Sequence, residues 1–160
     1  GFTLALPTKD RYFATKSELL DKICFALGGR VAEKLVLNEI STGAQNDLER
    51  VTALSRQMIM EFGMSEEMGP LTFGRKQHQV FLGRDLGRER DFSEEVASAI
   101  DRESRRLVEE CFRRTEELLR KNLDKLHAVA QAVLEQETLD ADEFVRIVGV
   151  GKGGKPINQV

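Results

Sequence analysis

The sequence predicts a mainly α-helical domain with one short strand near its N-terminus. Apolar residues recur at helical spacing over several long stretches, and residues that favour helix starts stand in front of them. Glycine and proline gather between these stretches. The length of 160 residues, 41% of them hydrophobic, is typical of a single water-soluble domain.

The predicted strand and the first helix lie in the first 40 residues. Gly1 to Leu6 is short and apolar and is followed by Pro7, which favours a strand at a sheet edge. Thr15 and Glu18 form a capping-box pattern, so we expect a helix from about Lys16 to Leu37. Apolar residues fall on opposite sides of this helix, which predicts burial of both faces: Leu20, Ile23, Leu27 and Val31 on one side, Phe25 and Val36 on the other.

Gly28 and Gly29 stand in the middle of the first predicted helix. Two glycines cost about 2 kcal/mol of helix propensity relative to two alanines. We therefore expect another backbone to pack closely against them, with a kink in the helix as the alternative.

A second helix is predicted from the capping-box pattern of Thr42 and Gln45 to about Phe62, where Gly63 would end it. The glycine-rich stretch from Met64 to Phe92 predicts a loop with one or two brief strands.

Three further helices are expected in the C-terminal half of the chain. Ser93 precedes a long amphipathic helix that ends near Lys121. Its apolar stripe contains Val96, Ile100, Leu107, Cys111 and Leu118. A fourth helix is expected over about 123–135, a fifth over about 141–148 after the capping residue Asp140, and a flexible tail over 149–160.

Charge and cysteine content exclude several classes of protein. The net charge is −3 and no basic block occurs, which argues against nucleic acid as a partner. The longest segment without a charged residue, Leu126 to Leu134, is far shorter than the ~20 apolar residues of a membrane-spanning helix. Cys24 and Cys111 have no CxxC partner and are expected to be buried free thiols rather than a disulfide scaffold. The chain begins at Gly1 without a signal-peptide pattern, as a piece of a longer protein would.

One acid in the second helix lies toward the apolar side. At ~100° per residue, Asp47 projects roughly 40° from Val51, into the arc of core-facing residues. That arc contains Ala44, Leu48, Val51, Leu54, Met58 and Phe62. An ionised carboxylate facing a core must be paired, hydrogen-bonded or bound to metal. Alternatively, Asp47 only complements the helix dipole, worth ~0.5 kcal/mol at an exposed site.

The sequence does not contain a complete motif for metal binding or nucleophilic catalysis. His78 and His127 are its only histidines, and neither belongs to an HExxH pattern. We expect both to be structural or solvent-facing. No GxSxG motif occurs, and the glycines do not form a phosphate-binding loop.

Several segments in order carry a family resemblance. The first two are Leu27-Gly28-Gly29-Arg30-Val31-Ala32-Glu33 and Ser41-Thr42-Gly43-Ala44-Gln45-Asn46-Asp47-Leu48. Phe62-Gly63-Met64-Ser65, Val80-Phe81-Leu82-Gly83-Arg84 and Ser93-Glu94-Glu95 follow. Together they resemble the peptidase domain of the FtsH family, membrane-anchored AAA ATPases that carry a zinc protease, from Gly1 to about Ile147.

The resemblance implies a helical metallopeptidase domain at 1–148, with the active-site half at 1–92 and a helical half at 93–148. In that family two histidines of an HExxH helix and an aspartate hold zinc, and the glutamate between the histidines is the general base. Asp47 matches the aspartate. The HExxH residues lie upstream of Gly1 in the family, so we expect no catalytic residue on this chain and no activity of the chain alone.

Other residues acquire expected roles from the same resemblance. Glu33 and Asn46 would support the metal ligands, although an exposed, solvated side chain explains each equally well. Phe2, Thr3 and Leu4, in the strand beside the cleft, would pair with an extended substrate, unless the strand is packed inside the fold.

For the intact protein, the resemblance implies a homo-hexamer at the cytoplasmic side of the cell inner membrane. It would degrade unfolded or membrane proteins, with zinc in the peptidase domain and ATP and magnesium bound elsewhere. Two alternatives remain open: a helical oligomerisation module, because the C-terminal helices carry no candidate chemistry, or a catalytically dead relative with a scaffold or chaperone role.

Overall fold

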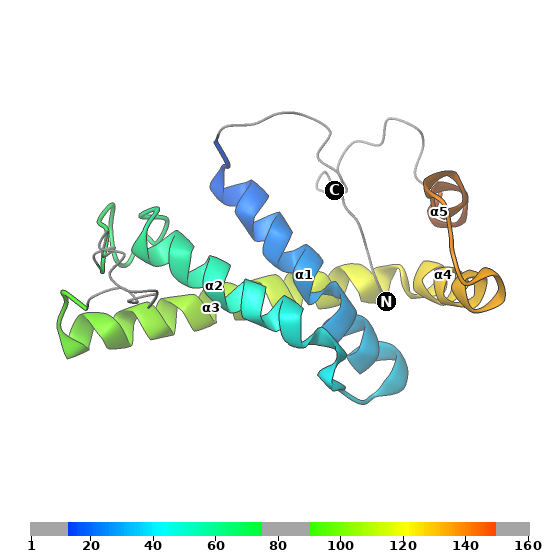
Figure 1. Ribbon diagram of the computed structural model, residues 1–160, viewed down its shortest axis with the longest axis horizontal. Helices are drawn as coiled ribbons and strands as arrows, with labels where there is room; N and C mark the ends of the chain where they lie inside the picture. Colours follow the sequence, from blue (N-terminus) through cyan, green and yellow to red (C-terminus); the bar gives the residue numbers. More distant parts are fainter. Residues whose placement is uncertain (1–12, 75–89, 150–160) are drawn as a thin grey trace, which may run out of the picture.

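The computed structural model describes residues 13–74 and 90–149, and within them it is helical, with no strand. The elements are α1 (Lys16–Leu37), the 3-10 turn η1 (Thr42–Ala44), α2 (Gln45–Met60), α3 (Glu94–Lys121), α4 (Leu123–Gln136) and α5 (Ala141–Val148). In Figure 1, α1 crosses α3, α2 runs back along α3, and α4 continues beyond the end of α3. The predicted strand Gly1–Leu6 and most of the tail lie outside the described residues.

Local sequence signals place most helix ends where the structure has them. Thr15 accepts a hydrogen bond from the backbone N–H of Glu18, and Ser93 accepts one from that of Val96. Asp140 forms a full capping box with Glu143. Each bond satisfies an amide that has no partner inside its own helix, which is why these starts were predictable.

The start of α2 differs from the prediction. Ser41, not Thr42, is the capping residue: its side chain accepts from the N–H of Gly43 and opens η1, and α2 follows with no side-chain cap. The predicted Thr42–Gln45 capping box is therefore wrong. The far end was also placed too late, because α2 ends at Met60. Phe62 lies beyond the helix and is 46% exposed instead of in the core.

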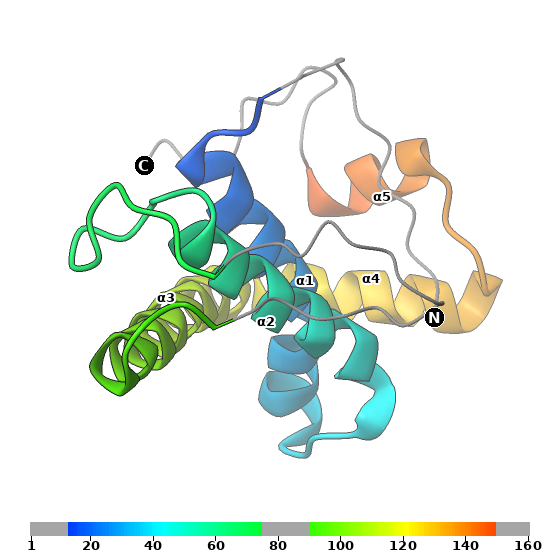
Figure 2. The same ribbon diagram turned by 60° about the vertical axis from the view of Figure 1, so that its left-hand side comes forward.

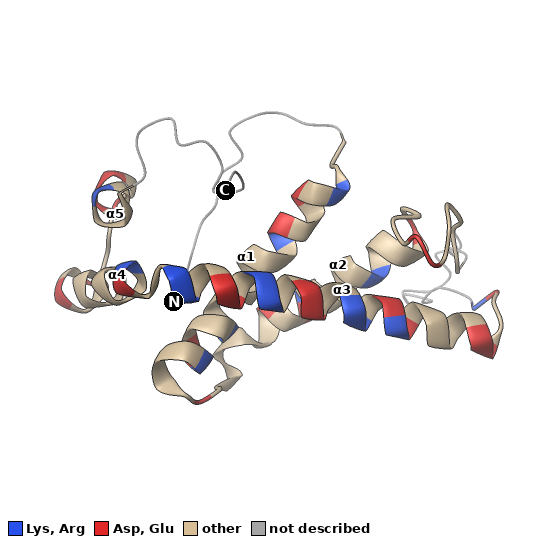
Figure 3. Ribbon diagram, turned by 180° about the vertical axis from the view of Figure 1, so that it is seen from behind, with Lys and Arg blue, Asp and Glu red and all other residues tan. Residues whose placement is uncertain are grey.

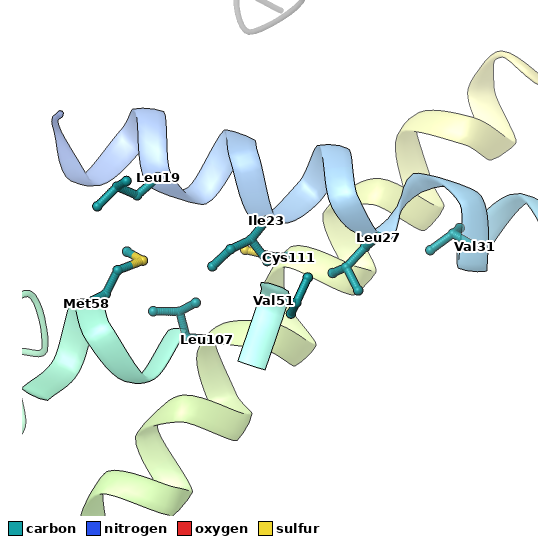
Figure 4. Packing of buried hydrophobic residues seen from close by; sticks show 8 residues of the cluster. All are labelled: Leu19, Ile23, Leu27, Val31, Val51, Met58, Leu107 and Cys111. Carbon is teal, nitrogen blue, oxygen red and sulfur yellow. The ribbon is translucent and has the colours of Figure 1, made fainter. Parts of the chain in front are cut away.

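The main core fills the space where α1, α2 and α3 meet (Figure 4). Its buried members are Leu19, Ile23, Leu27 and Val31 from α1, Val51 and Met58 from α2, and Leu107 and Cys111 from α3. A second cluster joins Ile59, Met60 and Ile100 near the start of α3. The predicted stripe of α3 is confirmed at Ile100, Leu107 and Cys111, whereas Leu118 is 41% exposed.

Only one face of α1 is buried in this chain. Phe25, on the opposite side, is 65% exposed, so the expectation of two buried faces is wrong for the described residues. Gly28 and Gly29 lie within an unbroken helix, and nothing lies within 4 Å of a Cβ placed at either position. The expected close backbone approach is therefore wrong as well.

The loop after α2 is fixed by polar contacts rather than by strands. Gly63 has φ +59°, and a Cβ there would lie 3.1 Å from the Pro70 Cα, so the turn requires glycine. Ser65 donates a hydrogen bond from its hydroxyl to the buried carboxylate of Glu103 on α3. No strand occurs in 64–74, and the rest of the predicted loop, 75–89, is outside the described part of the chain.

Helices α4 and α5 form a pair that stands apart from the main core (Figure 2). Neither contains a buried residue. None of the helices that the structure describes has the length and apolar character needed to cross a membrane.

Candidate metal-ligand site at the start of helix α2

Asp47 lies in the first turn of α2, on the side that faces α1. Its side chain is partly buried and lines a groove of about 540 Å³ between these two helices. The other walls are mainly apolar and include Ile23, Phe25 and Leu54. The sequence-based prediction that this acid points toward apolar surface is confirmed.

The Asp47 carboxylate makes no hydrogen bond or ion pair with any described residue. Arg50, one turn further along α2, lines the same groove without forming a salt bridge to it. The carboxylate therefore keeps both oxygens free for another ligand. Its place in the first helical turn also agrees with the helix-dipole alternative, so position alone does not choose between the two roles.

Glu33 of α1 holds the segment that leads to Asp47. Its carboxylate accepts a hydrogen bond from the Ser41 hydroxyl at 2.7 Å and another from the Ser41 backbone N–H at 3.2 Å. The Ser41 hydroxyl in turn accepts from the N–H of Gly43 at 3.1 Å. These bonds from Ser41 hold the pKa of Glu33 below its ordinary value, because they stabilise the ionised carboxylate.

Gly43 is part of the same arrangement. A Cβ at this position would lie 3.3 Å from the Ser41 Oγ and 3.6 Å from the Glu33 Oε1. A larger residue would therefore press on the hydrogen bonds that connect α1 to η1. Glu33, Ser41 and Gly43 together fix the turn from which α2 and Asp47 project.

Among the described residues, none of the others predicted for the site is seen in hydrogen-bond contact with the Asp47 side chain. Asn46 is exposed and makes no hydrogen bond with the described residues, so it does not orient Asp47 through a direct contact. Phe2, Thr3 and Leu4, expected to bind substrate, and His78 all lie outside the described residues. His127 is exposed on α4, which packs against α5 and α3.

The roles of Ser41 and Gly43 were missed in the sequence. The sequence singles out Ser41 only as the first residue of a segment that carries the family resemblance, because its partner Glu33 is eight residues away and belongs to another helix. A serine two residues before a glycine at a helix start was the available signal, but it does not identify the acid that the serine binds.

A zinc site needs three protein ligands, and the described residues supply one candidate. They contain no group of three or more His, Cys, Asp or Glu side chains that could surround a metal ion. A carboxylate oxygen at the edge of a partly apolar groove is chemically suited to be one ligand of zinc. The remaining ligands would have to come from other residues.

The fold and this groove define a helical domain in which the carboxylate of Asp47, unpaired among the described residues, lies beside an exposed apolar surface. The chain matches peptidase family M41 over residues 1–147, and it belongs to that family. It is 58% identical over 147 residues to the ATP-dependent zinc metalloprotease FtsH 1 of Thermoanaerobacter sp., covering 92% of this chain and 24% of the relative. It is 50% identical over 152 residues to the ATP-dependent zinc metalloprotease FtsH of Bacillus subtilis, covering 94% of this chain and 24% of the relative.

A third relative extends the same pattern. The ATP-dependent zinc metalloprotease FtsH 2 of Alkaliphilus metalliredigens is 55% identical over 147 residues, which cover 92% of this chain and 21% of the relative. The chain thus spans about a quarter of the length of these curated relatives. The resemblance seen in the sequence is confirmed at the level of the family.

Proposed function

We propose that this chain is part of an ATP-dependent zinc metalloendopeptidase and that Asp47 is the third protein ligand of its zinc ion. The observation that carries the proposal is the unpaired, partly buried Asp47 carboxylate in the groove between α1 and α2. A carboxylate in such a place is stabilised most simply by a cation. The names of the relatives identify zinc as the metal of those proteins.

The chain's own contribution would be to hold and orient one ligand. Glu33 and Ser41 fix the turn before α2, and the buried face of α2 fixes the helix against α1 and α3. Two histidines of an HExxH helix upstream of Gly1 would supply the other ligands, with the glutamate between them as general base. Bound zinc would lower the pKa of its water so that hydroxide is available near neutral pH.

The exposed apolar side of α1 supports this division of the site. Phe25 is 65% exposed and lies on the wall of the groove that contains Asp47. An additional helix packed here would bury Phe25, and side chains of that helix would reach the Asp47 carboxylate. This is where we place the HExxH helix.

The test is Asp47→Asn in a protein extended upstream to contain the HExxH residues. Asparagine keeps the shape but is an uncharged, weaker ligand, so bound zinc should fall and cleavage of an unfolded protein such as casein should drop at least a hundredfold. Asp124→Asn is the matched control, because Asp124 is an exposed acid in the first turn of α4 and loses only the helix-dipole contribution.

Unchanged zinc content and activity in Asp47→Asn would refute the ligand assignment. Equal losses in the two variants would show that the helix dipole, rather than metal binding, explains Asp47. The 160-residue chain alone should bind zinc only weakly and cleave nothing, since its described residues offer one candidate carboxylate and no group of three metal-binding side chains.

A second function is favoured by the α4–α5 pair. Leu134 is 79% exposed and Phe144 is 46% exposed, although both belong to helices with strong apolar stripes. We propose that this half contributes to the homo-hexamer of the intact, membrane-anchored enzyme, which would act on unfolded or membrane proteins. A catalytically dead relative would retain assembly through this half but would show no proteolysis even with Asp47 unsubstituted.

A further inference from the structure

Two cysteines far apart in the sequence meet where α1 crosses α3. The Cys24 thiol donates a hydrogen bond to the Cys111 carbonyl at 3.7 Å, across 87 positions of the chain. The Cys111 thiol donates to the carbonyl of Leu20, one turn before Cys24, at 3.9 Å. Each thiol therefore reaches the backbone of the opposite helix at the level of the other cysteine.

A threonine holds the two helices at this crossing. The Thr115 hydroxyl lies 2.8 Å from the Cys111 carbonyl and 3.4 Å from the Cys24 carbonyl. It can donate to either oxygen, and it ties α3 to α1 one turn beyond Cys111. The two cysteines consequently lie in a part of the α1–α3 interface that these contacts hold together.

The two thiols differ in access and in charge. Cys111 is 2% exposed and belongs to the main core, where Figure 4 shows it beside Ile23, whereas Cys24 is partly exposed. The neighbouring Cys111 side chain, with further contributions from Thr115 and the positive charge of Arg114, lowers the pKa of Cys24 to about 6. The same contact and burial raise the pKa of Cys111. Of the two sulfurs, the partly exposed Cys24 is therefore the one that ionises more readily.

We propose that Cys24 and Cys111 form a reversible redox pair, oxidised by hydrogen peroxide to a disulfide that joins α1 to α3. Both cysteines are free in the reduced chain. An accessible thiolate next to a second thiol is the arrangement of redox-sensing cysteine pairs.

The chemistry balances in two steps. The Cys24 thiolate attacks one oxygen of peroxide, so that the O–O bond breaks, a sulfenic acid forms and hydroxide leaves. The Cys111 sulfur then attacks the Cys24 sulfur, and the S–O bond breaks while the S–S bond forms. The leaving hydroxide takes the Cys111 proton as water. Two thiols lose two electrons and peroxide is reduced to water; a dithiol reductant reverses the change by exchange.

The disulfide would be a covalent link between α1 and α3. These helices form the core that positions Asp47, the candidate metal ligand. α1 carries Cys24 and, further along, Glu33, which holds the turn before Asp47. The disulfide would fix the crossing of α1 and α3 and restrict the denatured chain, because it closes a loop of 87 positions. The melting temperature should rise by roughly 5–10 °C.

The first experiment uses the full chain without substitution. The reduced protein is treated with a small molar excess of peroxide, digested without reductant, and analysed by mass spectrometry. We expect a linked pair of peptides containing Cys24 and Cys111, loss of both titratable thiols in each chain, and recovery of both after dithiothreitol. Thiols that remain titratable, links only between different chains, or oxidation only to sulfinic and sulfonic acids would each overturn the proposal.

Single variants separate the roles of the two sulfurs. In Cys111→Ser, dimedone should trap a sulfenic acid on Cys24, because no second thiol is present to displace it. In Cys24→Ser, Cys111 should react at least tenfold more slowly with peroxide. Equal or reversed rates would overturn the assignment of Cys24 as the attacking sulfur, whereas the linked peptide of the unsubstituted chain tests the pair itself.

Discussion

Helices α1, α2 and α3 share one buried cluster and α2 and α3 share a second, whereas α4 and α5 pack against each other without a buried residue. Both regions have apolar residues at helical spacing in the sequence. The difference lies in how many partners each stripe meets: the first three helices enclose a common centre, but two helices leave a large part of their apolar surface in water. Periodicity thus identifies an apolar face and does not say whether this chain covers it.

The polar contacts of the two regions also differ: several of those of α1, α2 and α3 join different helices, whereas those seen in α4 and α5 are local. The outer face of α3 carries both signs of charge along its length (Figure 3). Its ion pairs include Arg114 with Asp21 and Arg56 with Asp101, which connect it to α1 and α2. The α4–α5 pair instead depends on local features such as the Asp140–Glu143 capping box and the left-handed Gly149 at its end. The site-bearing region is therefore held by contacts distant in sequence, and the other by local ones.

The largest expected effect on stability comes from removing a buried side chain of the core that α1, α2 and α3 share. Ile23 is fully buried, so Ile23→Ala should lower the free energy of unfolding by about 3–4 kcal/mol through lost burial and a residual cavity. Leu134→Ala is the control in the other region: at 79% exposure it should change stability by less than about 0.5 kcal/mol. Urea unfolding measured by circular dichroism compares them, and similar losses would show that α4 contributes to a common core.

The second prediction concerns the acid that fixes the loop after α2. The side chain of Glu103 is 4% exposed and is bonded to Arg106 at 2.8 Å. This pairing, with a further hydrogen bond from Ser65, lowers the pKa of Glu103 to about 2. Since the folded-state pKa lies below the unfolded one, the stabilisation is present above about pH 4.5 and is lost as the pH falls toward 2.

Glu103→Gln should therefore cost about 2–3 kcal/mol at pH 7 and much less at pH 3, where the native chain has already lost part of this contribution. Glu110→Gln is the matched control, because Glu110 also pairs with Arg106 but is 64% exposed. It should cost less than about 0.5 kcal/mol at either pH. Urea midpoints at the two pH values give the comparison, and a pH-independent difference would contradict the proposed cause.

Local signals predicted the helices well, and contacts between helices explain the errors. The bounds of α3 and α5 follow from Ser93 and Asp140, because a capping side chain acts within its own turn. The cap of the segment before α2 was misassigned, because Ser41 is selected by its bond to Glu33 on another helix. A pattern read along one segment does not contain that information.

The candidate site was predictable to the extent that one helix determines it. Asp47 was identified from its angular position in α2, which is a local property, and its groove agrees with that expectation. Its role as a zinc ligand remains a proposal. The pairing of Cys24 with Cys111 was not predicted, because it depends on the crossing of α1 and α3 across 87 positions.

The smallest expected change in stability tests whether the outer side of α1 is as free of packing contacts as the outer side of α4. A Cβ at Gly28 or at Gly29 meets nothing within 4 Å, so alanine adds no clash and restricts only the unfolded chain. Each of Gly28→Ala and Gly29→Ala should raise the free energy of unfolding by about 0.5–1 kcal/mol. Gly63→Ala is the contrasting control and should destabilise by about 1–2 kcal/mol, because φ is +59° and the new Cβ would lie 3.1 Å from the Pro70 Cα. Thermal and urea unfolding of the three variants measure these changes, and destabilisation by Gly28→Ala would show that this side of α1 is packed, in contrast to the exposed side of α4.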